Sequence, residues 1–315
     1  MRLLMLIALI INAQKINAWG FYAHKLINET AVYTLPKPLF GFYKLHVDYI
    51  KSHAVDADKR RYLIAEEACR HFLDGDFYEK KAPLDTIPKY YKSACEKFGE
   101  DTVKQHGIVP WQIQFVMYQL TEAFKEKNSS KILKLSADLG HYVGDCHVPL
   151  HATSNYNGQK TNQVGIHGLW ESRLPELYTI DYDLFTGLAI YIEKPVDSIW
   201  KAYEQSFTLV DSVLKTEKEI TKKFPEDQKY SYENKGKTLV KVYSKEFCED
   251  YHNSLGNMVE NRLKSSIILL GSLWYTCWVN AGQPDLENMP IIEQEKEALP
   301  DENSLEDKKM IGREE

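Results

Sequence analysis

The sequence has no CxxC pair, no long apolar stretch after its first residues and no excess of basic residues. Structural zinc sites are usually closed and rich in cysteine, so the five scattered cysteines are poor candidates for zinc ligands. The apolar run at residues 3–11 is too short to cross a bilayer, which takes about 20 residues. We therefore expect no transmembrane anchor.

The net charge of −6 is unevenly distributed along the chain. Residues 284–315 contain eleven acids and four bases, a net charge of −7. Once this tail and the two bases Arg2 and Lys15 are subtracted, residues 19–283 keep a net charge of −1. Such a body lacks the basic field that drives non-specific binding to duplex DNA. The tail is interrupted by proline and free of aromatic residues, which predicts a disordered segment, with docking onto the body as the alternative.

The first 18 residues are typical of a secretory signal peptide. A basic Arg2 precedes the apolar run, and a small Ala18 follows it. Cleavage after Ala18 would make Trp19 the N-terminus of an exported protein, in the periplasm or outside the cell. In such an oxidising compartment the five cysteines could form one disulfide or two, which leaves an odd thiol.

The spacing of apolar residues predicts a body that is helical almost throughout, an all-α domain over residues 19–283. Strand-like alternation is sparse, and no internal repeat is found. Asn128 is expected to cap a helix. Residues 152–166 are rich in Asn, Gly, Thr and Ser, which predicts a loop. The expected helices cover residues 22–34, 110–126, 131–145, about 195–223 and about 237–280.

Two helical pairs of metal-binding side chains lie close together in the sequence, His141 with Asp145 and His167 with Glu171, and His151 lies between them. Each pair is spaced four residues apart, so both members project from one face of a helix. An imidazole and a carboxylate on one face suit Zn²⁺, which accepts nitrogen and oxygen ligands. One pair often makes only a surface hydrogen bond, but two pairs with a fifth ligand predict a metal site.

The motifs of residues 19–171 resemble those of the superfamily of zinc-dependent phospholipases C and single-strand-specific nucleases. In chain order they are Trp19-Gly-x3-His24, Asp…His71-Phe-x-Asp, His141-x3-Asp145-x3-Pro-Leu-His151 and His167-x2-Trp-Glu171. The resemblance implies a similar all-helical domain with a cleft that holds three zinc ions.

The resemblance also implies a ligand set for each ion. The sets are Asp56, His71, His141 and Asp145 for the first ion, His151, His167 and Glu171 for the second, and the amine and carbonyl of Trp19, His24 and the other oxygen of Asp145 for the third. Asp145 would thus bridge two ions. Asp58 is the alternative to Asp56, which is favoured by its spacing to His71 and by the Lys59 that follows.

The implied chemistry is hydrolysis of a phosphodiester. Clustered zinc ions generate hydroxide near neutral pH, and Asp56 could orient the attacking water. Phe72 and Asp74 correspond to residues that hold a base in the nucleases, although Phe72 fits core packing equally well. Lys59 could offset phosphate charge or simply be solvated. His147 is expected to face away from the metals.

Two substrates fit this resemblance. The Glu at position 171 and the 16-residue spacing from His151 to His167 favour a phospholipase C-like enzyme acting on phospholipid. The Trp19–His24 spacing, together with Phe72 and Asp74, favours a nuclease acting on single-stranded nucleic acid. We expect a monomeric phosphodiesterase and lean to the phospholipase. A secreted, non-catalytic zinc protein is the remaining alternative.

Overall fold

The computed structural model describes residues 20–235, 238–287, 289, 298–300, 305 and 310–313. The predicted signal peptide, Trp19 and most of the acidic tail lie outside these residues. Within them the chain is mainly helical, as the sequence predicts, with one antiparallel two-stranded sheet. No helix among the described residues combines the length and apolarity that crossing a membrane requires.

The helices and strands follow one another along the chain with these bounds: α1 Phe21–Val32, α2 Lys37–Leu45, α3 Val47–Ser52, η1 His53–Val55, α4 Asp56–Arg60, η2 Ala65–Arg70, α5 Gly75–Tyr78, α6 Tyr91–Phe98, α7 Glu100–Gln105, α8 Val109–Lys125, α9 Ser129–Cys146, η3 Pro149–Ala152, α10 Ile166–Gly168, η4 Leu169–Arg173, α11 Leu174–Tyr178, η5 Thr179–Asp181, α12 Pro195–Thr221, β1 Tyr230–Lys235, β2 Thr238–Tyr243, α13 Lys245–Leu255 and α14 Met258–Asn280.

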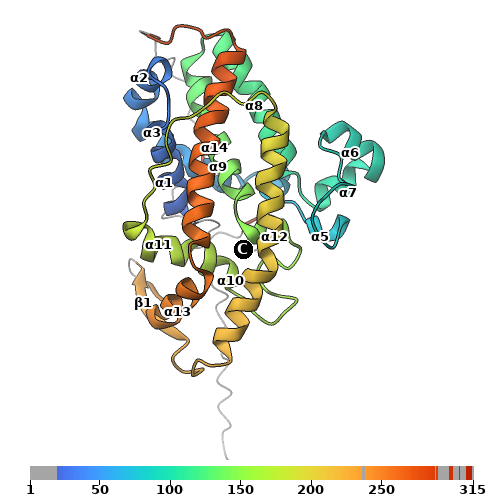
Figure 1. The fold of residues 1–315 in the computed structure, drawn as a ribbon, viewed down its shortest axis with the longest axis vertical. Helices are drawn as coiled ribbons and strands as arrows, with labels where there is room; N and C mark the ends of the chain where they lie inside the picture. The colour runs from blue at the N-terminus through green and yellow to red at the C-terminus, as the bar shows by residue number, and fades with distance from the viewer. Residues whose placement is uncertain are drawn as a thin grey trace, which may run out of the picture.

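Four long helices, α8, α9, α12 and α14, form the centre of the molecule, and each of them contacts the other three. They run along the long axis, with α1 to α3 on one side and α5 to α7 projecting on the other (Figure 1). Local signals set their starts: Pro110 and Pro195 lie in the first turns of α8 and α12, where a missing N–H costs nothing. The expected Asn128 cap is confirmed, because its side chain accepts a hydrogen bond from Lys131 N at 3.0 Å.

Helix α9 is buried on all sides over its second half, where every residue from 136 to 146 is inaccessible to solvent or nearly so. A helix buried all round normally carries apolar residues. This one carries His141 and Asp145 at 0% exposure. Buried polar groups must be paired or bind a metal, so the centre of the fold is also the place to look for a site.

Two glycines of α9 let α1 approach closely. A Cβ on Gly140 would lie 1.9 Å from Asn28 Oδ1, and a Cβ on Gly144 would lie 3.0 Å from His24 Nδ1. Asn28 also donates hydrogen bonds to Ala137 O at 3.1 Å and to Ile50 O at 3.3 Å. This contact places His24 of α1 against the face of α9 that carries Asp145.

One part of the predicted helical pattern is wrong. The helix expected at about residues 237–280 is instead β2, α13 and α14, and β2 pairs with β1 in a hairpin from Tyr230 to Tyr243. The loop expected at residues 152–166 is confirmed between η3 and α10. All five cysteines are described, and none of them forms a disulfide in the structure.

Candidate metal centre

Eight side chains from different parts of the chain meet in the interior as three groups, the first two of which share His141, and within each group the possible ligand atoms lie within 4.8 Å of one another. All eight side chains belong to residues that are at most 1% exposed. The groups are His24, His141 and Asp145; Asp58, His71 and His141; and His151, His167 and Glu171.

Asp145 lies between three imidazoles and uses its two oxygens differently. Its Oδ2 is 3.0 Å from His71 Nδ1 and 3.3 Å from His141 Nε2. Its Oδ1 faces His24 Nε2 at 3.5 Å. Each oxygen therefore points to a different group of nitrogens, which is the arrangement needed by a carboxylate that bridges two cations.

Glu171 and two imidazoles form the third group. The Glu171 Oε2 atom lies 2.6 Å from His167 Nε2 and 3.2 Å from His151 Nε2. Residues 169–173 form a π-helical turn directly after α10. Such turns are rare and frequent at functional sites, and this one places Glu171 on the same side as His167.

Backbone carbonyls orient three of the imidazoles. The Nδ1 atoms of His141, His151 and His167 lie 2.9 Å from Ala54 O, 2.6 Å from His71 O and 3.0 Å from Tyr156 O, respectively. An Nδ1–H that donates to a carbonyl leaves Nε2 as the unprotonated nitrogen, which is the usual arrangement behind a metal-binding histidine. In all three residues Nε2 is the atom that faces the carboxylates.

The carboxylate beside His71 is Asp58 and not the expected Asp56. Asp58 Oδ1 lies 3.7 Å from both His71 Nδ1 and His141 Nε2, and the residue is 1% exposed. Asp56 Oδ2 lies instead 2.5 Å from His53 Nδ1, and its Oδ1 is 3.3 Å from Lys59 Nζ. Residues two positions apart project from nearly opposite sides of a helix, so α4 can turn only one of the two inward.

The electrostatics of the centre are compatible with bound cations. Burial opposes ionisation, yet His141 and His151 hold the pKa of Asp145 well below its usual value. Burial likewise opposes protonation of His141, yet Asp145 and Asp58 raise its pKa to about 9. Burial, together with repulsion from His141, lowers the pKa of His24. Without metal the carboxylates thus draw protons onto a neighbouring imidazole, and bound cations would replace those protons.

Several buried atoms of the centre lack hydrogen-bond partners among the described residues. Both carboxylate oxygens of Asp58 and Oε1 of Glu171 are among them. A buried polar atom without a hydrogen bond costs about 1–3 kcal/mol. Asp58 and Glu171 belong to groups of nitrogen and oxygen donors without cysteine, a donor set that fits divalent metal ions.

Glu67 is a residue of the centre that the sequence analysis missed. Its Oε1 lies 3.6 Å from His71 Nε2, the nitrogen that points away from Asp145. Glu67 is fully buried, and its Oε2 accepts from Arg60 Nε at 3.2 Å and Arg70 Nη1 at 2.7 Å. The four-residue spacing from Glu67 to His71 is the same signal that marked the two expected pairs.

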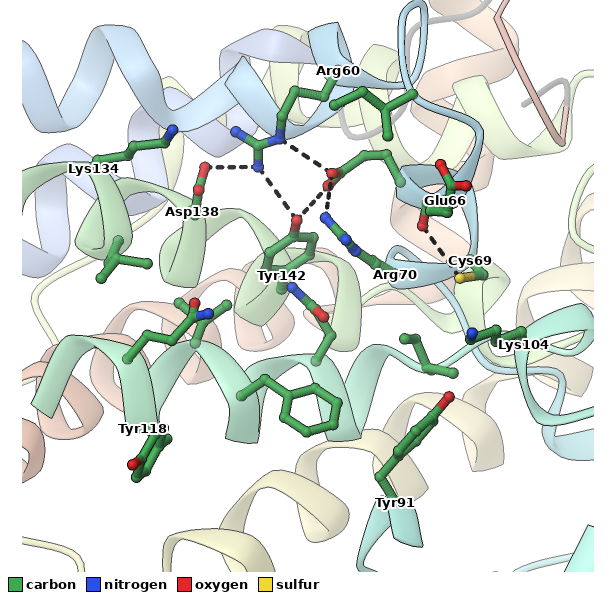
Figure 2. Close-up of a pocket in the computed structure, with 18 of the residues that line it drawn as sticks. Arg60, Glu66, Cys69, Arg70, Tyr91, Lys104, Tyr118, Lys134, Asp138 and Tyr142 are labelled. Carbon is green, nitrogen blue, oxygen red and sulfur yellow. Dashed lines mark hydrogen bonds and ion pairs between the residues drawn. The ribbon is translucent and has the colours of Figure 1, made fainter. Parts of the chain in front are cut away.

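The charged network around Glu67 lies in a pocket on the side of His71 opposite the cluster. Figure 2 shows Arg60 between Asp138 and Tyr142, with Arg70 close by. Arg60 Nη2 donates to Asp138 Oδ1 at 3.0 Å, and the Tyr142 hydroxyl donates to Glu67. This network fixes the position of the Glu67 carboxylate behind His71.

The other expected residues lie around the cluster. Phe72 and Asp74 are both buried and both contact Arg313, while Lys59 pairs with Asp56. His147 is buried with its Nδ1 2.7 Å from Val143 O, and it belongs to none of the three metal groups.

Trp19 lies outside the described residues, but its neighbour Gly20 donates its N–H to Ser172 Oγ at 3.0 Å. Ser172 directly follows Glu171, so the chain enters the described structure beside the metal centre.

The sequence matches no protein-family model, and no curated protein is significantly similar to it. The case for a metal centre therefore depends on the residues that the fold brings together.

Proposed function

We propose that the chain is an exported zinc-dependent phosphodiester hydrolase with the fold of the phospholipase C and zinc nuclease superfamily. The observation that carries the proposal is the gathering of eight buried histidine and carboxylate side chains into three groups, each close enough to hold a metal ion. The absence of cysteine from these groups distinguishes the centre from a structural zinc site, which is usually cysteine-rich and closed.

The proposed ligand sets follow the geometry, with one change from the sequence expectation. Asp58 takes the place of Asp56 in the first set, together with His71, His141 and Asp145, while His151, His167 and Glu171 form the second. His24, Asp145 and Trp19 form the third, which is supported by the position of Gly20 beside Ser172.

The residues of the chain have distinct parts in the proposed reaction. Bound zinc ions would supply a hydroxide near neutral pH and offset charge on the phosphoryl oxygens. Asp145 holds the first and third sets together, because its two oxygens face different imidazoles. Asp58 takes the role first expected of Asp56, orienting the attacking water, because its oxygens have no hydrogen bond among the described residues.

A phospholipase C-like activity is the first candidate. Beyond Glu171 and the short loop before His167, it is supported by exposed apolar side chains between α11 and α12. Phe185 is 90% exposed and Leu188 is 69% exposed. Exposed apolar side chains grouped along one segment suit contact with a lipid interface.

A nuclease acting on single-stranded RNA or DNA is the second candidate. It is supported by Phe72 and Tyr156, whose rings both lie against the planar guanidinium of Arg313, with Asp74 paired to the same group. Aromatic faces that accept a flat group suit stacking of a nucleobase.

The deciding experiment compares two substrates with one preparation of protein. Hydrolysis of phosphatidylcholine vesicles and of single-stranded RNA is measured before chelation, after chelation and after zinc is restored. We expect chelator-sensitive, zinc-restored hydrolysis, and the preferred substrate identifies the branch. If the zinc-loaded protein cleaves neither substrate nor a simple aryl phosphodiester, the enzyme assignment is wrong and a non-catalytic zinc protein is favoured.

A further inference from the structure

Residues 310–313 come from the far end of the acidic tail and lie against the metal centre. The Arg313 guanidinium is 3.4 Å from the centroid of the Phe72 ring and 4.5 Å from that of Tyr156. The same group forms an ion pair with Asp74. The Arg313 side chain is only 12% exposed. This side chain is thus held by two aromatic faces and a carboxylate.

The backbone of this segment forms its own hydrogen bonds, both with Arg61. Ile311 N donates to Arg61 O at 3.0 Å, and Arg61 Nη2 donates to Arg313 O at 2.9 Å. Gly312 has a φ of +98°, and a Cβ there would lie 2.5 Å from Ala68 Cβ. The close approach and the backbone conformation both require glycine at this position. Three consecutive residues therefore make specific contacts with the body.

The residues that hold Arg313 adjoin the proposed zinc ligands. Phe72 directly follows His71, while the Tyr156 carbonyl accepts from His167 Nδ1 at 3.0 Å and its ring lies 6.3 Å from the His167 ring. The buried Arg61 has its Nη1 3.6 Å from Asp58 Oδ1. The segment thus touches neighbours of two of the three metal groups.

We propose that residues 310–313 form an intramolecular inhibitor. This proposal rests on the phosphodiesterase function proposed above. Arg313 occupies the place against the Phe72 and Tyr156 rings where the flat or apolar part of a substrate would bind beside the metal centre. Its positive charge is neutralised by Asp74, and the two hydrogen bonds with Arg61 hold the segment in register. Release of the segment, by proteolysis or by competition from substrate, opens the site.

The test compares the wild type with Arg313→Ala at matched zinc content. We expect kcat/KM for the preferred phosphodiester to rise about tenfold, as it would if the segment covers the site about 90% of the time. Arg313→Lys keeps the charge but loses the flat face that stacks on aromatic rings, so it should give an intermediate increase. Lys308→Ala removes one positive charge from the same tail and is the control, with unchanged kcat/KM.

A second measurement does not depend on activity. The synthetic peptide Met-Ile-Gly-Arg, which corresponds to residues 310–313, should bind the Arg313→Ala protein in calorimetry and should bind the wild type at least about tenfold more weakly. Equal kcat/KM in wild type and Arg313→Ala, or no peptide binding to the variant, would contradict the proposal that residues 310–313 act as an inhibitor. Peptide binding without any phosphodiester hydrolysis would retain the docking site and refute the enzyme function alone.

Discussion

Glu67 Oε1 lies 3.6 Å from His71 Nε2, on the side of the imidazole that faces away from Asp145. The Nδ1 atom of the same ring lies 3.0 Å from Asp145 Oδ2. A carboxylate behind an imidazole fixes the tautomer of the ring and increases the basicity of the nitrogen that binds the metal. We therefore expect Glu67 to act as a positioning residue for His71.

Replacement of Glu67 by glutamine should weaken zinc binding about 10- to 100-fold, because a neutral amide holds the His71 tautomer less firmly. Zinc affinity is measured by competition with a chelator of known affinity. Glu66→Gln is the matched control, since Glu66 is exposed one residue away, and it should leave zinc affinity unchanged. Equal affinities in the two variants would exclude the positioning role.

The two aspartates of α4 give a second pair of matched variants. Asp58→Asn should lower the zinc content and abolish most hydrolysis, because it removes a buried carboxylate 3.7 Å from both His71 and His141. Asp56→Asn disturbs only a partly exposed ion pair with Lys59 and the contact to His53, which costs about 0–1 kcal/mol. Zinc analysis of both purified proteins decides between them. The opposite result would restore Asp56 as the ligand.

Alanine should have opposite effects at two helical glycines, one at the contact between α1 and α9 and one in open space on α2. Gly140→Ala should destabilise the protein by about 1–3 kcal/mol, because its Cβ would lie 1.9 Å from Asn28 Oδ1. Gly41→Ala in α2 has no atom within 4 Å of the added Cβ and should stabilise by about 0.5–1 kcal/mol. Urea unfolding measures both changes. A stable Gly140→Ala protein would mean that the helices are not in tight contact.

Burial and the charge of Arg262 hold the pKa of His147 well below its usual value of 6.5, so the folded protein keeps this imidazole neutral. The unfolded chain takes up a proton at His147 below about pH 6.5, whereas the folded protein does not. The free energy of unfolding is therefore highest above that pH and decreases as the pH falls. This single group changes the free energy of unfolding by at most about 1.4 kcal/mol per pH unit. Unfolding of the metal-free protein between pH 5 and 7 should depend less on pH in His147→Gln. Identical slopes would contradict a neutral, buried His147.

The sequence predicts the parts of the centre that depend on local spacing. The His141–Asp145 and His167–Glu171 pairs lie together because helical geometry places residues four apart on one face. The choice between Asp56 and Asp58 depends on how α4 is rotated, which is set by packing on α9 and not by local spacing. The hairpin from Tyr230 to Tyr243 was missed because its apolar residues also fit a helical pattern.

Contacts between distant parts of the chain could not be predicted from local patterns. Arg313 is 239 positions from Asp74, and nothing in the composition of an acidic tail indicates which of its residues docks. The position of Glu67 behind His71 follows a local spacing, but its role depends on the buried network with Arg60 and Arg70. Such networks are fixed by tertiary packing.

The most direct test of the metal centre is the zinc content and phosphodiester hydrolysis of the wild type beside Asp145→Asn. Asp145 is the carboxylate whose two oxygens face separate imidazoles, and an amide bridges two cations poorly. We predict that the wild type binds about three zinc ions with chelator-sensitive hydrolysis, and that Asp145→Asn loses at least one ion and nearly all activity. Full zinc content and a near-normal rate in Asp145→Asn would contradict the bridged centre.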